Sequence, residues 1–387
     1  MAPQGTVGLL MITSITLLVS APLSAEPRPC TLPFSDGEHI ADLSDETIDE
    51  SSGLADSWLS SNRLWTHNDS GDQPRLWALD KLGQVTTVVH LDGADNIDWE
   101  DMAIAPCSAD DPSPCIYMAD FGDNNSVRDF VTIYRFPEPD LGDEPPASIT
   151  IDDFETLHYA YDTGPRDAET LLVHPTDRRL WVIEKTGEPE VAIFEIPEDF
   201  DHPEPHVVSS VATVTIPGAL ALTRMVTGGD IAPDASELSF RTYTQVYTFC
   251  IDDPDDVAAA FAGEPVTTTV LPATIQGEAL TYDRGDHSLW LTSEMIPAPL
   301  IQLRRSEAEA PDPDPEPEPE PEPSPPDTAE PPPSEDAGQD RRDASQSHRP
   351  GNDPSPGTSG CSCSQTPDGS SGFFFVALLL LCLCRSR

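Results

Sequence analysis

The chain has 387 residues and a formal net charge of −49, from 69 acidic and 20 basic residues. Nucleic acids and anionic membrane surfaces are bound through basic patches, so this charge excludes nucleic acid as a partner of the folded part. The same excess of carboxylates favours cations.

The first 25 residues predict a secretory signal peptide. An apolar run, VGLLMITSITLLVSA, is followed by PLSAEP, and cleavage is expected after Ala25, although no Lys or Arg precedes the run. Export makes disulfides possible. Cys107 and Cys115 bracket a turn-rich connection and are expected to pair, which leaves Cys30 for Cys250. A zinc site is not expected, because no CxxC pair has a distant partner pair.

Residues 30–305 predict an all-β domain. They contain short alternating or β-branched runs separated by turn residues, and no long run with the helical period. Five similar segments begin at SSGLA, WEDMA, DAETL, GGDIA and QGEAL. In each, an apolar strand, a second strand that often starts Leu-Trp, and a third strand follow one another. Candidate fourth strands are QVTTVVHL, FETLHYAY, VVSSVATVTI and VTTTVL.

The spacing of these segments favours a β-propeller. Alignment on Gly53, Asp101, Glu169, Asp230 and Glu278 gives intervals of 48, 68, 61 and 48, by subtraction of residue numbers, which suits blades of roughly 40 to 50 residues with insertions. The fifth segment lacks a fourth strand, and the unused run 38–43 (EHIADL) is expected to supply it and close the ring. We predict five four-stranded blades, or six if one is too degenerate to recognise. A pair of β-sandwiches is the alternative.

A propeller places the loops between second and third strands on the face where the first strands begin. These loops are HNDSGD, ADFGDNN, EKTGEPE, TYTQ and SEMIPA. The strand starts are expected to add acidic residues at the same channel mouth: Glu50, Glu100, Asp101, Asp167, Glu169, Asp230 and Glu278. Few basic residues accompany them: Lys185, Arg224 and Arg241.

Crowded carboxylates and amides predict a hard cation, with Ca²⁺ expected outside the cell. The expected metal ligands are Asn68, Asp69, Asp72, Asp120, Asp123 and Asn124. Residues expected to contact a small-molecule or glycan ligand are Glu100, Asp101, Asp230, Lys185 and Arg241. The competing interpretation is ordinary turn chemistry, because Asn, Asp and Gly are the residues that tight hairpins use.

If the face is catalytic, the candidate residues are Glu169, Glu278 and His67. Glu169 or Glu278 would serve as the base of a Ca²⁺-dependent hydrolase of lactones, esters or phosphoesters. A single histidine beside a turn is more often structural. The recurring tryptophans at 65, 77, 99, 181 and 290 are expected to pack between blades.

The chain from about residue 306 to 358 alternates proline with acids, as in PDPDPEPEPEPEPEP, and predicts an extended, disordered stalk. Residues 359–387 then combine a Cys-Ser-Cys element, a short apolar run and two arginines. This tail resembles the myxobacterial C-terminal sorting signal (MYXO-CTERM), which implies anchoring to the cell surface, the outer membrane or another part of the envelope, with release after processing as an alternative.

The motifs ESSGLA, LWTHNDSGD, DWEDMA, DFGDN, DAETLLV, VTGGDIAPD and QGEAL, in that order, resemble a group of secreted bacterial β-propeller proteins. They are distantly similar to phytase-like and gluconolactonase-like propellers, a resemblance that implies calcium and hydrolysis. The favoured hypothesis is a monomeric, surface-tethered propeller that binds a divalent cation and a ligand at its acidic face. The alternatives are a Ca²⁺-dependent hydrolase and a non-catalytic adhesin or structural surface protein.

Overall fold

The computed structural model describes residues 30–272, 274 and 276–306. The predicted signal peptide, almost all of the predicted stalk and the predicted sorting tail lie outside these residues. Within them no helix is long and apolar enough to cross a membrane.

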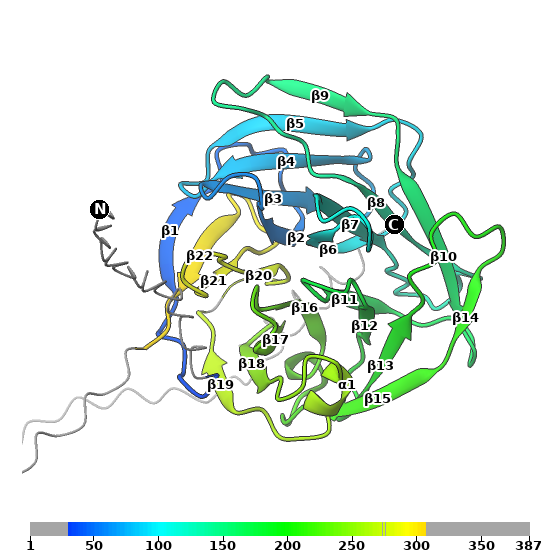
Figure 1. The fold of residues 1–387 in the computed structure, drawn as a ribbon. Helices are drawn as coiled ribbons and strands as arrows, with labels where there is room; N and C mark the ends of the chain where they lie inside the picture. Colours follow the sequence, from blue (N-terminus) through cyan, green and yellow to red (C-terminus); the bar gives the residue numbers. More distant parts are fainter. Residues whose placement is uncertain (1–29, 273, 275, 307–387) are drawn as a thin grey trace, which may run out of the picture. The chain divides into compact units, whose positions relative to one another are not determined.

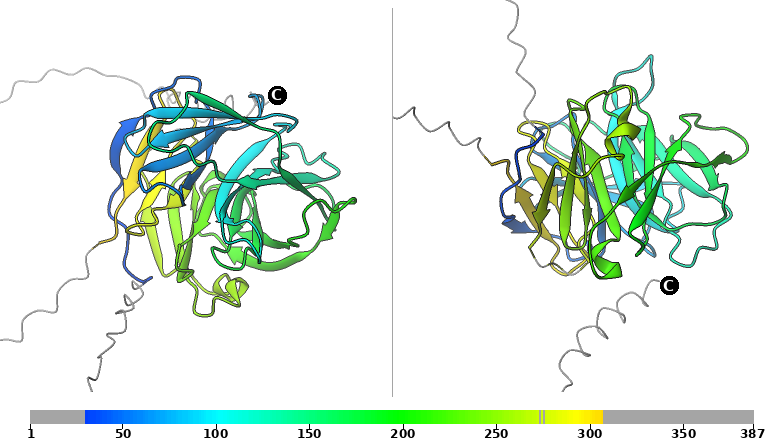
Figure 2. Two further views of the ribbon diagram at one scale, coloured as in Figure 1. Left: turned by 45° about the horizontal axis from the view of Figure 1, so that its top comes forward. Right: turned by 90° about the horizontal axis from the view of Figure 1, so that it is seen from below.

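Five sheets stand around a common axis, each with one strand facing the centre (Figure 1). The prediction of a five-bladed β-propeller is confirmed. Two further views show the same ring from other directions (Figure 2). The inner strands are β2 (Ser51–Asp56), β6 (Trp99–Pro106), β11 (Ala168–Val173), β16 (Val226–Ile231) and β20 (Leu280–Tyr282).

The remaining strands extend each blade outward by antiparallel pairing. The first blade continues with β3 (Arg63–Asn68), β4 (Arg75–Asp80) and β5 (Val85–Leu91). The second continues with β7 (Pro114–Asp120), β8 (Val131–Pro137) and β10 (Glu155–Tyr161). The third continues with β12 (Leu180–Glu184), β13 (Glu190–Ile196) and β15 (Ser210–Thr215). The fourth continues with β17 (Glu237–Thr242), β18 (Gln245–Cys250) and β19 (Thr267–Val270), and the fifth with β21 (Leu289–Leu291) and β22 (Pro299–Leu303). The short helices η1 (Ala221–Thr223) and α1 (Val257–Ala260) lie in connections.

Two outer strands were not predicted. β9 (Ser148–Ile151) pairs in parallel with β5, and β14 (His206–Val208) pairs in parallel with β10. Each gives its blade a fifth strand. The run VVSSVATVTI, predicted as one strand, is therefore divided: its start belongs to the second blade and its remainder, β15, to the third.

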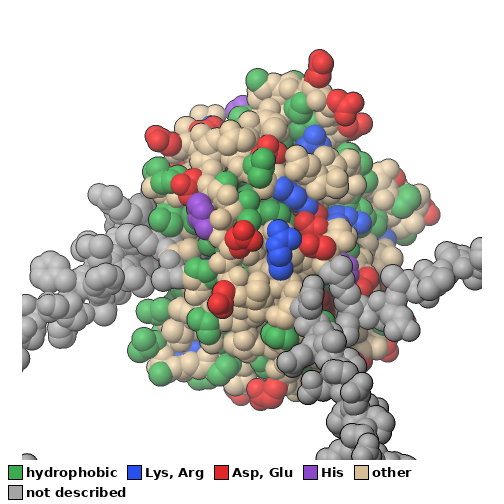
Figure 3. Space-filling view, turned by 90° about the vertical axis from the view of Figure 1, so that its left-hand side faces the viewer, with side chains coloured by type: hydrophobic (Ala, Val, Ile, Leu, Met, Phe, Trp, Pro, Cys, Tyr) green, Lys and Arg blue, Asp and Glu red, His purple; other side chains and the backbone are tan. Residues whose placement is uncertain are grey.

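The ring closes through the N-terminal strand, as predicted. β1 (Glu38–Asp42) pairs antiparallel with β22, so the fifth blade contains both ends of the domain. Both predicted disulfides, Cys30–Cys250 and Cys107–Cys115, are present. On the outer wall that carries β1, acidic, basic and hydrophobic side chains are interspersed where the described surface is visible (Figure 3).

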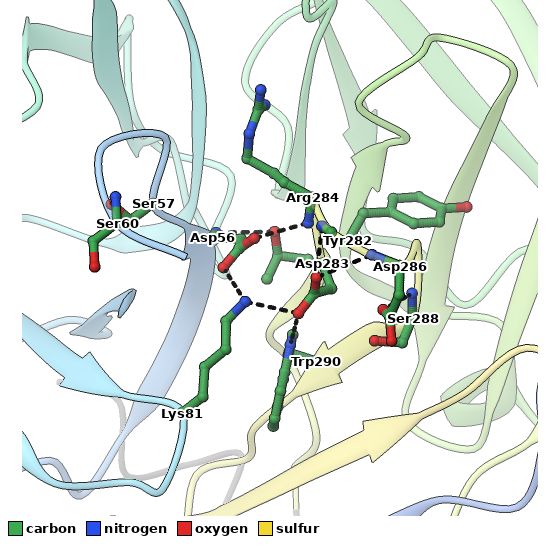
Figure 4. Close-up of polar contacts among 12 residues, drawn as sticks. Asp56, Ser57, Ser60, Lys81, Tyr282, Asp283, Arg284, Asp286, Ser288 and Trp290 are labelled. Carbon is green, nitrogen blue, oxygen red and sulfur yellow. Dashed lines mark hydrogen bonds and ion pairs between the residues drawn. The ribbon is translucent and has the colours of Figure 1, made fainter. Parts of the chain in front are cut away.

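A buried ion network joins the first blade to the fifth. The Lys81 ammonium lies 2.8 Å from Asp56 and 2.7 Å from Asp283, and the Trp290 indole donates to Asp283 at 3.0 Å (Figure 4). Burial raises the pKa of Asp56 to about 6 despite Lys81. Because Lys81 follows β4 and Asp283 follows β20, this network reinforces the closure of the ring.

The core lies between neighbouring blades. The inner strands β2, β6 and β11 are buried along their whole length, since both of their faces pack on adjacent sheets. The predicted packing role of the tryptophans is confirmed: those at 65, 77, 99 and 181 have no exposed surface, and Trp290 is 4% exposed.

A β-bulge recurs near the start of the inner strands. The register shifts by one residue in the first four blades, where the extra residues are Ser52, Glu100, Glu169 and Thr227. Gly53 therefore corresponds to Asp101, Thr170 and Gly228. The alignment predicted from the sequence was wrong by one residue at Glu169 and by two at Asp230, because it followed the acidic residues instead of the strand register.

Candidate cation site at the mouth of the propeller

The bulges place buried polar residues around the channel mouth. A bulge re-aims one side chain and is common next to functional sites. In the fifth blade, the Glu294 amide donates to the Gln276 carbonyl at 3.0 Å, as the Gly122 amide does to the Asp98 carbonyl in the second blade. Glu278, two residues after Gln276, is therefore the equivalent of Glu100, and the predicted alignment was wrong by one residue there too. Glu100, Glu169 and Glu278 are 1%, 2% and 2% exposed. Burial first, and then nearby carboxylates that include Glu278, raise the pKa of Glu100.

A second set of residues follows the second strand of each blade. Its members are tied by their amides to the residue before the inner strand: Asp69 to Glu50 at 2.9 Å, Gly122 to Asp98 at 3.1 Å, and Lys185 to Asp167 at 2.9 Å. Together with Tyr243 and Glu294, these residues complete the mouth. Its composition is strongly acidic, as the sequence predicted.

Three carboxylates of the mouth form a cluster with metal-ligand geometry. Ligand atoms of Asp69, Asp98 and Glu100 all lie within 4.8 Å of one another. Glu100 Oε1 is buried and has no hydrogen-bond partner within the described residues. A buried carboxylate oxygen without a donor is costly unless a proton or cation supplies the missing interaction.

Gly122 leaves the space in which two of these carboxylates meet. A Cβ atom on residue 122 would lie 2.2 Å from Glu100 Oε1 and 2.6 Å from Asp98 Oδ2. Any side chain at this position would displace them. The glycine of the DFGDN motif is therefore required by the close approach of these two carboxylates.

The electrostatics of this cluster favour a positive charge. Burial, and then the charge of Asp98, raise the pKa of Asp69 well above its usual value. Burial and the charges of Asp69 and Asp98 do the same to Glu100, and burial with Asp167 raises the pKa of Asp98 to about 6. A bound cation would remove this penalty and release the protons.

Lys185 already supplies one positive charge to the mouth. Its ammonium forms an ion pair with Glu169, and the two side chains are 7% and 2% exposed. Burial disfavours the charge of Lys185, but the carboxylates of Glu278 and Glu100 raise its pKa above the ordinary value. Lys185 therefore occupies one oxygen of Glu169, while Glu169 Oε2 is buried without a hydrogen-bond partner among the described residues.

Glu278 and Glu294 form the other side of the mouth. The Tyr243 hydroxyl donates to Glu278 Oε1 at 3.4 Å, and Gln276 donates to Glu294 at 2.6 Å. Burial and the charge of Glu278 raise the pKa of Glu294 well above its usual value. Glu278 Oε2 is buried and has no hydrogen-bond partner among the described residues.

Most of the other predicted metal ligands shape the loops. Asn68 donates to the Thr47 carbonyl at 2.8 Å, and Asp72 binds Arg75 through both oxygens, at 2.8 and 2.9 Å. One Asp120 oxygen accepts from Arg128 at 2.9 Å and from the Asp98 amide at 3.0 Å.

The last two predicted ligands lie in the loop after β7. Asp123 accepts from the amides of Val127 and Arg128 at 2.9 and 2.8 Å, and Asn124 is exposed. Of the six predicted ligands, the structure brings only Asp69 into the cluster. A metal-binding role for the other five stays a prediction.

Asp101 and Asp230 bond to neighbouring inner strands. Asp101 accepts from the amides of Met102 and Leu171, both at 2.9 Å. Asp230 accepts from the Thr281 hydroxyl and the Tyr282 amide, both at 2.9 Å. With Asp56 it lines a small cavity of about 20 Å³ at the far ends of the inner strands, so it does not join the mouth.

Two basic residues proposed for the mouth also bond to backbone. Arg241 is fully buried and donates to the carbonyls of Ala279 and Thr292 at 3.0 and 3.1 Å, and burial lowers its pKa to about 10. Arg224 donates to the carbonyls of Gly187 and Gly218. Both arginines join adjacent blades or loops.

His67 is enclosed in the blade. Its ring packs edge-on against Trp99, with 5.7 Å between centroids, and burial lowers its pKa to about 4. A Cβ on Gly53 would lie 2.2 Å from its Nε2. The histidine is thus neutral near pH 7 and packed against backbone, which favours the structural interpretation.

Asp98 was missed by the sequence predictions. It immediately precedes the inner strand β6, where Glu50 and Asp167 precede β2 and β11. An acid precedes three of the five inner strands, β2, β6 and β11, so the sequence NIDWEDMA contained a usable signal for Asp98.

No family model matches the sequence, and no curated protein matches it. Among solved structures, the fold is similar to the PQQ-bound form of an aldose sugar dehydrogenase from Streptomyces coelicolor. The two share 12% sequence identity, with a TM-score of 0.41, and the match covers 70% of this chain and 99% of that chain. A likeness at this level carries no argument about cofactor or activity, so the function must come from the site itself.

Proposed function

We propose that this protein is a propeller that binds a divalent cation at its acidic mouth, with Asp69, Asp98 and Glu100 as protein ligands, and that the cation helps to hold a small ligand. The observation that carries the proposal is the convergence of these three carboxylates within 4.8 Å around a buried Glu100 oxygen that has no partner within the described residues. Acidic loops alone would not suffice, because most of them serve as turn acceptors.

Calcium is the cation that this ligand set suits best. All three ligands are oxygens, and Ca²⁺ accepts about six to eight oxygen ligands at roughly 2.3–2.6 Å. Three carboxylates leave several coordination positions for water or for oxygens of a bound molecule. The proposed role is therefore binding, in which the cation attracts oxygen-rich or carbonyl-bearing ligands that the acidic mouth would otherwise repel.

Isothermal titration of metal-depleted protein with Ca²⁺, Mg²⁺ and Mn²⁺ tests the proposal. We expect one cation to bind per chain, with Asp98→Asn and Glu100→Gln each weakening binding by at least about tenfold, or about 1.4 kcal/mol. Glu195→Gln is the control, because Glu195 is an exposed strand residue on β13. Wild-type protein that binds none of the three cations would refute the proposal.

A hydrolase is the second candidate, and one observation favours it. Glu278 is 2% exposed, and its Oε2 has no partner among the described residues, so it could accept a proton from a nucleophile. Glu169 Oε2 is unpartnered as well, but its other oxygen forms an ion pair with Lys185, whereas no ion pair of Glu278 occurs among the described residues, which makes Glu278 the better base of the two. Turnover of lactone, ester or phosphoester substrates that is lost in Glu278→Gln, with cation binding retained, would support hydrolysis. Absence of turnover across that panel would leave the binding function.

We also propose that the propeller functions outside the cytoplasm, at the cell surface. The two disulfides support this proposal, since such bridges persist in oxidising compartments and are rare in the cytosol. Fractionation of the native cells, followed by mass spectrometry without reduction, is the test. Protein found in the cytosol with all four globular cysteines reduced would contradict it.

A further inference from the structure

A second cavity lies on the rim of the same face, between the second and third blades. Its volume is about 80 Å³, and it is bounded by the start of β8, the end of β10 and the connection from β10 to β11. β8 begins just after the loop that contains Gly122, and Tyr159 at the end of β10 pairs with Val131 at the start of β8. The cavity therefore opens at the end of the propeller that carries the acidic cluster.

The lining of this cavity differs in charge from the mouth beside it. Arg128 and Arg166 flank it, with side chains that are 12% and 29% exposed. The buried Tyr159 and Tyr161 form part of its wall, and the exposed Asp129 is the one acid among the lining residues. Two arginines at one cavity are a marked local excess in a chain with 69 acids and 20 bases.

Arg128 retains donors for a ligand. Its Nη1 donates to Asp120 and to the Gly122 carbonyl, both at 2.9 Å. Within the described residues its Nε and Nη2 make no hydrogen bond that meets the usual geometry. Arg166 is bound to Glu184 and to the Thr163 hydroxyl, so its guanidinium is held in place beside the cavity. A fixed guanidinium at a half-closed site loses little entropy when it binds an anion.

We propose that this rim cavity binds the anionic group, a carboxylate or a phosphate, of a small organic ligand, with Arg128 and Arg166 as its cationic partners. Guanidinium groups recognise planar carboxylates and phosphates through charge-assisted hydrogen bonds. The volume suits one such group, so the remainder of the ligand would extend over the exposed Phe130 ring. The site does not require the cation proposed for the mouth, although Arg128 and the amide of Asp98 share the Asp120 carboxylate.

Calorimetric titration of the full chain in metal-free buffer tests this inference independently of the cation. The probes are benzoate, phenyl phosphate and the uncharged benzyl alcohol. We expect at least one of the two anions to bind and the alcohol not to bind. The preferred anion shows whether the cavity selects carboxylate or phosphate.

Two variants identify the cavity. Arg166→Gln should weaken binding of the preferred anion by at least about tenfold, and Ala160→Leu, which fills the cavity without changing its charge, should weaken it as well. Arg178→Gln is the control, since Arg178 lies in the same blade at the opposite end of β11. Thermal melting establishes that each variant is folded, and if Arg166→Gln is not, Ala160→Leu decides. The inference would be overturned if neither anion binds or if the alcohol binds equally well. It would also be overturned if the folded cavity variants bind the anion as tightly as wild type, or if Arg178→Gln weakens binding as much as they do.

Discussion

Gly122 sets how closely the Asp98 and Glu100 carboxylates can approach one another. A Cβ atom at residue 122 would lie 2.2 Å from Glu100 Oε1 and would force this carboxylate to move. We therefore predict that Gly122→Ala lowers Ca²⁺ affinity by at least about tenfold, as measured by calorimetric titration. Gly263→Ala is the matched control, because the nearest atom to a Cβ at that position would be the Ala260 carbonyl oxygen, 3.9 Å away. Unchanged affinity in a folded Gly122→Ala protein would show that the cation does not bind there.

Lys185 acts as an internal counter-ion of the mouth. Lys185→Met leaves Glu169 buried without its cation, and loss of one partner of a buried pair costs about 3–5 kcal/mol. We predict a loss in this range in the free energy of unfolding of metal-free protein at pH 8, measured by urea denaturation. The same variant should bind Ca²⁺ more tightly, because a competing positive charge is gone. A variant as stable as wild type without metal would contradict this role.

The closure of the ring depends on more than the pairing of β1 with β22. Lys81, between Asp56 and Asp283, joins the first and fifth blades where all three side chains are at most 15% exposed. Replacement by methionine leaves two neighbouring buried acids and should lower the free energy of unfolding by about 3 kcal/mol or more.

Urea denaturation measures this effect, and Arg304→Met provides the control. Arg304 is 57% exposed and its acidic partners lie 3.9 Å away, so its loss should change stability by no more than about 0.5 kcal/mol. Equal effects of the two substitutions would show that the Lys81 network does not reinforce closure.

The strands were predictable where a local pattern identified them. Five Leu-Trp-like second strands and an unused N-terminal run were sufficient for five blades and their closure. The strands β9 and β14 could not be predicted, because their parallel pairing joins segments separated by long connections and leaves no local signal. The bulges left no sequence signal either, because one extra residue does not interrupt an apolar strand. In the second blade, the bulge nevertheless makes Glu100, and not Asp101, the residue that joins the acidic cluster.

The sequence predicted on which face of the propeller the candidate site lies, but it identified only some of the residues of that site. The sequence pattern of strand starts and second loops was sufficient to identify Asp69 and Glu100. It could not separate an acid that faces the channel from one that accepts backbone amides, as Asp123 does, because both occur in the same turn sequences. Asp98 became recognisable only when the three positions before the inner strands were compared.

The buried acids of the mouth should make the stability of the metal-free protein decrease as pH rises. Unfolded Asp and Glu have pKa values of about 3.9 and 4.3, whereas in the folded protein burial raises that of Asp98 to about 6 and those of Asp69 and Glu100 well above their usual values. The folded state thus holds protons that the unfolded state has lost. Their contribution to stability is complete below about pH 4 and is lost as pH rises through 6 and above.

We therefore predict that metal-free protein melts at a lower temperature at pH 8 than at pH 5. Ca²⁺ should raise Tm more at pH 8, where fewer protons compete for the carboxylates. At about 100 times Kd, linkage adds about 2.7 kcal/mol, enough for a shift of several degrees. Differential scanning calorimetry at both pH values measures this. A calcium-induced shift that is larger at pH 5 would contradict it.

The most direct test is a crystal of the protein soaked in Mn²⁺, which replaces Ca²⁺ at oxygen sites and scatters anomalously. We predict an anomalous peak on the channel axis side of Gly122, within coordination distance of Asp69, Asp98 and Glu100. A fully ordered mouth with no peak at this cluster, at a Mn²⁺ concentration that saturates other oxygen sites, would contradict the account.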